Sequence, residues 1–415
     1  MNPPRVVVAG GGAAGCFAAI TCAEAAPATR VTVLEKSPLF LAKVRISGGG
    51  RCNVTHACFE PRDLSRHYPR GGAALRGPFT RFQPRDTRAW FERRGVKLKI
   101  EPDGRMFPAG DSSRAILECL TRSARAAGVT LRPRCEVTAL ARRPAGGFTL
   151  ALAGGERLDC ERLMLATGGC RTAADGSLPL ALGHSLEPPV PSLFAFRLAT
   201  PWGRELAGVA VADAELSLPG PGLRERGPLL FTHTGLSGPA ILRLSAWGAR
   251  ALHAARYQFP LRVNWLPHLG PAALAAQLDH RRAAEPARRI ANSPLSPLPA
   301  RLWQRLVQAA GIPPETRWAG LPRAARHQLI EHLRATELQV NGRSPNQDEF
   351  VTCGGVRLRE VNFHTMESRL CPGLYFGGEL LDIDGLTGGF NLQAAWTTGW
   401  IAGRAMAGLT GQTPS

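Results

Sequence analysis

A glycine-rich turn near the start of the chain constrains its fold more than any other feature. The β-branched run 5–9 leads into GGGAAG at 10–15, and a small, helix-prone stretch follows at 16–26. This order predicts strand, turn and helix with the spacing G-x-G-x-x-G. Gly10 permits the sharp turn, Gly12 lets a pyrophosphate approach the backbone, and Gly15 lets the helix pack on the strand. The helix N-terminus then offers N–H groups and partial positive charge to phosphates.

An acidic residue follows where a dinucleotide-binding unit needs one. The β-rich run 30–34 ends in Glu35, 20 residues past Gly15. A carboxylate at this distance meets the ribose hydroxyls of a bound dinucleotide. An ordinary βαβ unit with a Gly-rich turn and a solvated Glu is the alternative, and the context favours the dinucleotide.

Length and cysteine usage narrow the class of protein. A chain of 415 residues predicts two or three domains. Its ten cysteines form no C-x-x-C pair, which indicates neither a zinc ribbon nor a redox pair, so we predict no metal site. No apolar run is long enough for a membrane span. The first strand begins within five residues, and we therefore expect no signal peptide and a cytoplasmic protein.

The net charge of +19 comes almost entirely from arginine, since only four of the 51 basic residues are lysines. A GC-rich coding sequence is one explanation. The other is a polyanionic partner such as nucleic acid. Residues 191–345 carry 19 Arg against 9 acids, whereas the rest of the chain has 32 basic and 23 acidic residues. The positive charge is therefore denser in this segment, which favours the second explanation.

The local composition and residue pattern of the chain change twice, which predicts a discontinuous first domain. Strand-like runs with frequent Pro and Gly fill about 191–263, a helical pattern follows to 338, and the Gly-rich style returns near 346. We predict a dinucleotide-binding domain at 1–190 and 346–415, a β-barrel-like insert at 191–270 and 336–345, and a helical insert at 271–335. The arginines and aromatic rings interleaved at 60–100 suit either a nucleic-acid surface or helices with one packed face.

Three further stretches suit a bound dinucleotide. SGGGRCN at 47–53 is a loop with exposed N–H donors and a cation, fit to lie along a phosphate or a flavin ring. A strand ends in small residues at 166–169. A third strand ends in Gly-Gly-Glu at 377–379, and a loop then leads into a helix from about 394, whose N-terminus suits the O2 side of a flavin.

Together these stretches resemble the BaiN/RdsA-like family of FAD-dependent oxidoreductases. The match runs in order over nearly the whole chain. SGGGRCN at 47–53 and GGELLDIDGLTGGFNLQ at 377–393 are its most specific parts, and FTHTGLSGPA at 231–240 and VTCGGV at 351–356 also fit. One departure is Cys353, where a polar or basic residue is expected.

The resemblance implies an α/β fold: a Rossmann-like, glutathione-reductase-type FAD-binding domain with an inserted β-barrel plus helical domain. It also implies FAD as cofactor. The residues expected to bind it, from the motifs and the resemblance, are Gly10, Gly12, Ala13, Ala14, Gly15, Glu35, Lys36, Lys43, Ser47, Gly48, Gly49, Gly50, Arg51, Asn53, Val137, Thr167, Gly168, Gly169, Gly378, Glu379, Asp384, Gly388, Gly389, Phe390, Asn391 and Leu392. Only one dinucleotide fingerprint is evident, so NAD(P)H is expected to bind transiently as reductant.

Members of the family reduce C=C bonds, and linked activities include dihydrouridine formation in large-subunit ribosomal RNA and steps of bile-acid reduction. For uracil the hydride goes to C6, and an acid close to C5 supplies the proton. We predict Cys52 and His233 as catalytic candidates, ahead of Glu379 and Asp384, which suit contacts with FAD or the backbone. Arg51 precedes Cys52 and is expected to lower its pKa. Cys52 as a packing residue and His233 as a structural hydrogen-bonding group remain open.

The sequence thus predicts an enzyme that reduces uridine in 23S ribosomal RNA, with the Arg-rich insert binding phosphates. Two other functions remain open. One is an NAD(P)H-dependent reductase of a small, apolar, steroid-like substrate. The other is a non-catalytic flavoprotein that binds RNA or ribosomes. The oligomeric state does not follow from the sequence.

Overall fold

The computed structural model describes residues 3–170, 173–220, 222–344 and 351–409. They form two compact units. The sheet unit consists of the described residues up to 191 and from 351 onward, and the barrel unit consists of those between 192 and 344. The predicted boundary between 345 and 346 lies outside the described residues.

A seven-stranded sheet with the order β19-β20-β21-β10-β1-β2-β6 is the centre of the sheet unit. Strands β21, β10, β1, β2 and β6 are parallel, and β20 and β19 continue one edge in antiparallel fashion. The hydrophobic run of β1 is buried at Val6, Val7 and Val8, as expected for a parallel strand covered on both faces. The strands are β1 (Arg5–Ala9), β2 (Arg30–Glu35), β6 (Thr130–Pro133), β10 (Arg162–Leu165), β19 (Val361–Asn362), β20 (Glu367–Ser368) and β21 (Leu374–Phe376).

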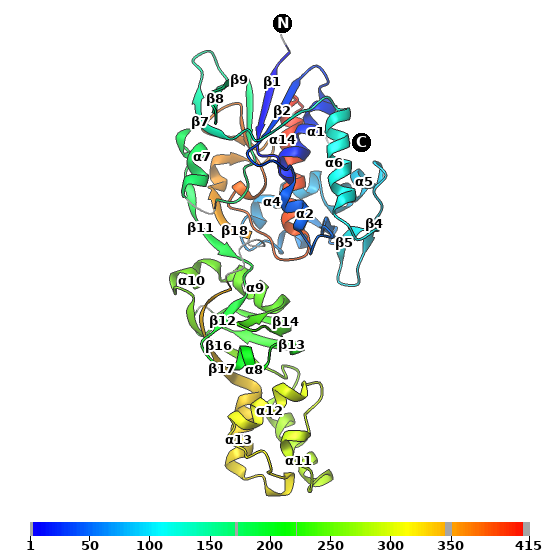
Figure 1. Cartoon of the computed structure of the whole chain (residues 1–415), viewed down its shortest axis with the longest axis vertical. Coiled ribbons are helices and arrows are strands. Elements are labelled where there is room, and N and C mark those ends of the chain that lie inside the picture. The colour runs from blue at the N-terminus through cyan, green and yellow to red at the C-terminus, as the bar shows by residue number, and fades with distance from the viewer. Residues whose placement is uncertain (1–2, 171–172, 221, 345–350, 410–415) are drawn as a thin grey trace. The chain divides into compact units, whose positions relative to one another are not determined.

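Two helices with small residues pack closely against each other beside this sheet (Figure 1). They are α1 (Ala13–Ala25) and α14 (Phe390–Met406). A Cβ at Gly399 would lie 2.5 Å from the Ala14 carbonyl oxygen, and one at Gly403 would lie 2.5 Å from that of Ala18. The contact therefore requires glycine at both positions. Helix α6 (Arg114–Ala126) also contacts α1.

The stretch 60–100, rich in arginine and aromatic residues, forms helices that bury their rings. Phe79 and Phe91 are fully buried and Trp90 is 5% exposed, which favours the packed-face alternative for the aromatic residues. These helices are α3 (Pro61–Ser65), α4 (Gly72–Arg81) and α5 (Pro84–Glu92). The smaller sheets comprise β3 (Thr55–His56), β5 (Arg105–Pro108) and β4 (Leu98–Ile100); β7 (Val137–Arg142), β8 (Phe148–Leu152) and β9 (Arg157–Cys160); and β11 (Leu186–Ser192) with β18 (Val351–Val356).

The remaining helical segments of the sheet unit are short. The α-helices are α2 (Ala42–Ile46) and α7 (Ser177–Ala181), and the 3-10 turns are η1 (Ala173–Gly176), η4 (Leu358–Glu360) and η5 (Gly378–Leu380). Within the described ranges, no helix is long and apolar enough to cross a membrane.

The barrel unit contains a closed barrel in the order β12-β15-β14-β13-β16-β17 (Figure 1). Its strands alternate buried and exposed residues, as in β16, where Phe259, Leu261 and Val263 point inward. The strands are β12 (Phe196–Leu198), β13 (Ala210–Ser217), β14 (Arg224–Phe231), β15 (Gly235–Ser237), β16 (Gln258–Asn264) and β17 (Thr336–Arg343), with helices α8 (Trp202–Glu205), α9 (Pro239–Trp247) and α10 (Ala249–Ala254).

A helical segment lies between β16 and β17 and shares one hydrophobic core with the barrel. Trp265 follows β16, while Trp303 and Trp318 belong to the helical segment, and all three are fully buried. The fold class predicted from the sequence is confirmed: a Rossmann-like α/β sheet with an inserted barrel that carries helices. The segment comprises α11 (Pro271–Ala284), η2 (Ile290–Asn292), α12 (Ala300–Ala309), η3 (Trp318–Gly320) and α13 (Arg323–Ala335).

Candidate active site

The carboxyl ends of four neighbouring strands bring the predicted motifs to one edge of the large sheet. Ala9 of β1 is opposite Leu34 of β2 and Leu165 of β10, and Leu165 is opposite Phe376 of β21. In open α/β sheets, ligands bind outside the carboxyl ends of the strands. The segments that follow these strands therefore meet where a dinucleotide is expected: 10–15, 35–37, 166–169 and 377–379.

The three glycines of the G-x-G-x-x-G spacing differ in the space that surrounds them. A Cβ at Gly10, whose φ is +112°, would lie 2.2 Å from the Ala166 carbonyl oxygen, and a Cβ at Gly15 would lie 2.0 Å from that of Gly10. A Cβ at Gly12 would meet nothing within 4 Å. Gly10 and Gly15 are thus required by packing, and Gly12 leaves open space in front of α1.

The N-terminus of α1 provides hydrogen-bond donors for a ligand in this open space. Gly12 is the N-cap, and the first bond within the helix runs from the Cys16 N–H to the Gly12 carbonyl at 3.0 Å. The N–H groups of Ala13, Ala14 and Gly15 precede that bond, and such groups have no partner within a helix. They suit the phosphate oxygens of a dinucleotide.

Glu35 lies at the end of β2 and is held by the backbone. Its two carboxylate oxygens accept the N–H groups of Gly11 and Ser37, each at 2.8 Å. This fixes the carboxylate beside the first turn, where the ribose contact is predicted. Lys36 is exposed, and Val137 begins β7 and is half-buried; their contacts with a cofactor remain predictions.

The SGGGRCN loop has an open backbone, and its arginine pairs with carboxylates of the same unit. Gly49 and Gly50 have positive φ values of +68° and +83°, and a Cβ at either would meet nothing within 4 Å. The Arg51 guanidinium donates to Glu101 and to Asp111, and its Cζ lies 3.9 Å from the centre of the Phe107 ring.

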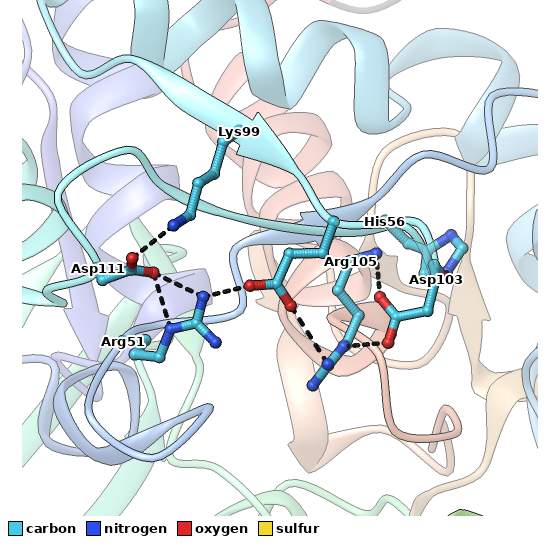
Figure 2. A network of polar contacts seen from close by, with 7 residues as sticks. Arg51, His56, Lys99, Asp103, Arg105 and Asp111 are labelled. Atoms are coloured by element: carbon cyan, nitrogen blue, oxygen red, sulfur yellow. Dashed lines mark hydrogen bonds and ion pairs between the residues drawn. The ribbon is translucent and has the colours of Figure 1, made fainter.

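Figure 2 shows Arg51 in a network of charged side chains that continues through Lys99, Arg105 and Asp103. The Arg51 side chain is thus paired with carboxylates, and its contact with a phosphate stays a prediction. Acidic neighbours from the β4–β5 hairpin and the segment after it use the Nε and Nη2 groups of Arg51 to hold the loop.

Asparagine side chains lock the loop at 385–391 in place. The Asn53 amide, oriented to satisfy its neighbours, accepts the Gly389 N–H at 2.9 Å and donates to the Thr55 carbonyl at 3.0 Å. The Asn391 amide both accepts from and donates to the Gly385 backbone at 2.8 Å. These two side chains hold the N-terminus of α14, whose first N–H groups lie at residues 390–392 after the N-cap Gly389. A role for the backbone of 388–392 in cofactor binding remains a prediction.

Glu379 connects three of the predicted cofactor segments. Its carboxylate pairs with Lys43 at 2.5 Å and accepts the Thr352 N–H at 2.8 Å. A Cβ at Gly169 would lie 2.8 Å from the same carboxylate, so Lys43, Gly169 and Glu379 lie together. Gly378 donates its N–H to Thr398 of α14, and the space above it is bounded by Ala14 of α1. Thr167, which is exposed, and Gly168 belong to the same strand end as Gly169. In the 47–53 loop, the Ser47 carbonyl accepts a hydrogen bond from the Cys52 N–H.

The expectation that Arg51 lowers the pKa of Cys52 is wrong. Burial raises the pKa of the Cys52 thiol to about 12, and a hydrogen bond with Ser47 only partly opposes this shift. Cys52 is 0% exposed, and the nearby guanidinium is committed to Glu101 and Asp111. A fully enclosed thiol with this raised pKa is a weak acid that a substrate does not reach, so Cys52 suits packing better than proton donation.

The other acid candidates differ in exposure. Asp384 is fully buried and forms a bidentate ion pair with Arg70, with 2.5 Å between Arg70 Nε and Asp384 Oδ1. It holds the loop after β21, and its predicted contact with the cofactor stays a prediction. His233 belongs to the barrel unit and lies exposed in the turn between β14 and β15.

Two histidines that the sequence did not indicate lie beside the N-terminus of α14. His67 stacks on Phe390 with 4.3 Å between the ring centres, and His56 stacks on the same ring at 4.7 Å. Burial lowers the pKa of His56, and burial together with the neighbouring His56 lowers the pKa of His67. Phe390 lies more than 300 positions away in the sequence, and no local pattern signals such a contact.

The donor set fits FAD. The α1 N-terminus and the open space at Gly12 suit the pyrophosphate, Glu35 suits the adenosine ribose, and Gly49 and Gly50 leave the backbone accessible. The N-terminus of α14 supplies a second set of donors. Within the described ranges, no group of three or more His, Cys, Asp or Glu side chains is arranged to hold a metal ion.

The family and the named relatives that the chain matches define an FAD-dependent oxidoreductase that acts on carbon–carbon bonds. The chain belongs to the HI0933-like protein Rossmann domain family, whose model matches residues 4–405. This membership confirms the resemblance found from the motifs.

Named relatives match almost the whole chain. It is 33% identical to a ribosomal RNA dihydrouridine synthase of Escherichia coli, with 95% of this chain and 96% of the relative covered. It is 30% identical to a 3-dehydro-bile acid delta(4,6)-reductase of Clostridium scindens, with 97% and 99% covered. Among solved structures, a 3-ketosteroid delta1-dehydrogenase from Sterolibacterium denitrificans matches with a TM-score of 0.52, 11% identity, and coverage of 98% of this chain and 100% of that one. At that identity, the last match shows the fold alone.

Proposed function

We propose that this protein reduces uridine to dihydrouridine in 23S ribosomal RNA. The observation that carries the proposal is the full-length match, at 33% identity, to a protein named as a ribosomal RNA dihydrouridine synthase. A second relative with that name, from Haemophilus influenzae, is 26% identical over 95% of the chain. The net charge of +19 supports a polyanionic substrate.

We further propose which parts of the chain form each domain and which residues bind the cofactor. Residues 1–190 and 346–415 form the FAD domain, 191–270 with 336–345 the barrel, and 271–335 the helical part. The N–H groups of Ala13, Ala14 and Gly15 bind the pyrophosphate, and Glu35 binds the ribose. Lys43, the 47–50 backbone, Gly169 and the start of α14 enclose the rest of the cofactor. Bound FAD, when reduced, supplies the hydride for C6 of uracil.

The proton for C5 must come from a group that reaches the substrate. We propose His233, because it is exposed in the turn between β14 and β15, whereas Cys52 is enclosed and its thiol pKa is raised to about 12. NAD(P)H is the proposed transient reductant, and the cytoplasm is the proposed compartment.

The alternative is a reductase of a small, unsaturated, steroid-like substrate. A specific observation favours it: the relative named as a bile-acid reductase is 30% identical and is covered over 99% of its length. The identities of this chain to the two relatives differ by only three percentage points.

Mass-spectrometric mapping of dihydrouridine in 23S ribosomal RNA from a deletion strain tests the proposal. Loss of one dihydrouridine, restored by the wild-type gene and not by a His233→Asn gene, is expected. Unchanged dihydrouridine refutes the proposal.

A second experiment separates the alternatives. The purified protein is titrated with NADH and NADPH, with ribosomal RNA or with an unsaturated 3-ketosteroid, while the flavin absorbance is followed. Reoxidation of reduced flavin by the steroid alone supports the small-substrate reductase. Flavin that no reductant can reduce, with or without RNA, supports a non-catalytic flavoprotein.

A further inference from the structure

The helical segment of the barrel unit holds two arginines directly opposite each other. Arg289 and Arg317 form an isolated antiparallel β-bridge. The flanking hydrogen bonds run from the Ile290 N–H to the Thr316 carbonyl (3.0 Å) and from the Trp318 N–H to the Arg288 carbonyl (3.1 Å). This pattern makes Arg289 and Arg317 a non-hydrogen-bonded pair, the arrangement in which opposite side chains lie closest, with Cα atoms about 4.5 Å apart.

Both side chains are exposed, and their charges are not neutralised locally. Within the described part of the chain, no carboxylate lies within ion-pair distance of Arg289 or Arg317. Like charges directly opposite on a β pair destabilise it. A third arginine, Arg282, donates to the carbonyl of Ala319, two residues past Arg317, and a carbonyl leaves its charge in place.

What distinguishes this pair among the 19 arginines of its unit is the β-bridge, which holds Arg289 and Arg317 directly opposite each other. Eight arginines there form ion pairs with carboxylates of the same unit: Arg224, Arg226, Arg243, Arg262, Arg281, Arg288, Arg305 and Arg326. The nearest acid in the sequence before Arg289 is Glu285, and both Arg281 and Arg288 use it.

The backbone beneath the pair is anchored in the hydrophobic core of the barrel unit. Ile290 and Trp318, next to the two arginines, are fully buried. The Trp303 indole N–H donates to the Ile290 carbonyl at 2.7 Å and ties this segment to α12. The backbone that carries the two guanidinium groups is therefore held in place before RNA binds, which lowers the entropy cost of binding.

We propose that Arg289 and Arg317 form a clamp for the phosphate backbone of RNA. Two planar guanidinium forks suit phosphate oxygens, which accept paired N–H donors. A bound phosphate also removes the repulsion between the two cations. The choice of RNA as the polyanion rests on the proposed function, whereas the existence of an anion site rests on the bridge alone.

The test is RNA binding by the flavin-loaded, full-length protein, followed by fluorescence anisotropy with a labelled single-stranded RNA of mixed sequence. The clamp variant is Arg289→Gln/Arg317→Gln. The matched control is Arg226→Gln/Arg262→Gln, which removes the same charge from ion-paired arginines of β14 and β16. Titrations at several salt concentrations give the slope of log affinity against log salt.

We expect the clamp variant to bind RNA about tenfold more weakly and to lower the salt slope by about 1.4, since each phosphate contact contributes about 0.7 on a single strand. The control variant is expected to change affinity less than about twofold. Without RNA, the clamp variant is expected to unfold at the same temperature as wild type or slightly higher, because repulsion is removed. A merely structural role predicts a lower temperature.

Equal loss in both variants assigns the effect to overall charge and overturns the clamp, as does unchanged binding in the clamp variant. Competition by poly-glutamate as effective as by RNA overturns the assignment to phosphate. Failure of the clamp and failure of the proposed function are distinguishable, because dihydrouridine mapping in the deletion strain does not depend on where RNA is held.

Discussion

The dinucleotide edge of the sheet unit and the arginine-rich surface of the barrel unit differ in the chemical groups that make their contacts. At the edge, the contacts are made by the backbone: glycines against carbonyl oxygens, and N–H groups at two helix ends. On the barrel unit, long charged side chains dominate, and eight arginines already have carboxylate partners. In the first kind of site, packing forbids a side chain at positions such as Gly10 and Gly15. The second kind depends on which charges remain after pairing.

The difference shows why charge count is a poor guide to a binding surface. The 191–345 segment has 19 arginines against 9 acids, but most of these acids are used in ion pairs within the unit. Surface pairs of this kind stabilise a protein little, by about 0 to 1 kcal/mol each. Eight of the 19 arginines use these acids, and Arg289 and Arg317 are among those that no carboxylate of the described residues neutralises.

The largest effect is expected from Gly15→Val in the dinucleotide turn. The first added carbon would lie 2.0 Å from the Gly10 carbonyl oxygen, so α1 must move off the strand. We expect a loss of about 3 kcal/mol or more in the free energy of unfolding, and no flavin in the purified protein. Urea unfolding and the ratio of flavin to protein absorbance measure both.

Gly12→Ala is the matched control, because a Cβ there meets no protein atom within 4 Å. It is expected to keep the unfolding midpoint of the flavin-free protein and to weaken FAD binding. A folded Gly15→Val protein with normal flavin content would break the distinction between packing and cofactor glycines.

The second largest effect is expected from Asp384→Asn in the sheet unit. Asp384 is fully buried and the Arg70 side chain is 11% exposed, so the substitution removes a buried carboxylate charge that faces the Arg70 cation. Breaking such a buried pair costs about 3 to 5 kcal/mol. Thermal and urea unfolding are the measurements.

The control for Asp384 is Arg66→Gln, which removes a pair whose side chains are 69% and 57% exposed. A change within about 0.5 kcal/mol is expected there. If the two variants lose the same stability, the Arg70–Asp384 pair does not differ from a surface pair and the structural role assigned to it is wrong.

The sequence predicted the parts of the site that depend on backbone spacing. Gly10, Gly15 and Glu35 occupy the places that the G-x-G-x-x-G spacing indicates, since strand, turn and helix are local structures. The direction of the Arg51 side chain was not predictable, because Glu101 and Asp111 are 50 and 60 positions away.

The burial of individual side chains could not be predicted from the local sequence either. Cys52 follows an arginine in a glycine-rich loop, and this context suggests a reactive thiol. Its enclosure depends on contacts that form only when distant segments pack together. The same holds for Asp384, whose partner Arg70 lies 314 positions earlier, and for the two histidines stacked on Phe390.

A third prediction compares the two catalytic candidates, one in each unit. With its thiol pKa raised to about 12, Cys52 stays neutral across the working pH range. We expect Cys52→Ala to retain activity within about threefold with an unchanged pH profile, and His233→Asn to lose about 100-fold, as expected when a general acid is removed. The measurement is the rate of dihydrouridine formation against pH. A 100-fold loss in Cys52→Ala with a changed alkaline limb would restore the thiol as the proton donor.

The smallest effect concerns the response of the sheet unit to acid. The pKa values of His56 and His67 are lowered in the folded protein, mainly by burial. Below about pH 6.5 the unfolded chain therefore binds protons that the folded chain does not, and stability falls as the pH falls. His67→Gln is expected to flatten the decline of the unfolding temperature between about pH 7.5 and 5.5.

The control for His67 is His327→Gln, an exposed histidine of α13 in the barrel unit. It should leave the decline as it is in wild type. Some decline should persist in His67→Gln, because burial also lowers the pKa of His184 in the sheet unit. An unaltered pH dependence in His67→Gln would mean that the stacked histidine keeps an ordinary pKa, and that acid sensitivity does not separate the two units.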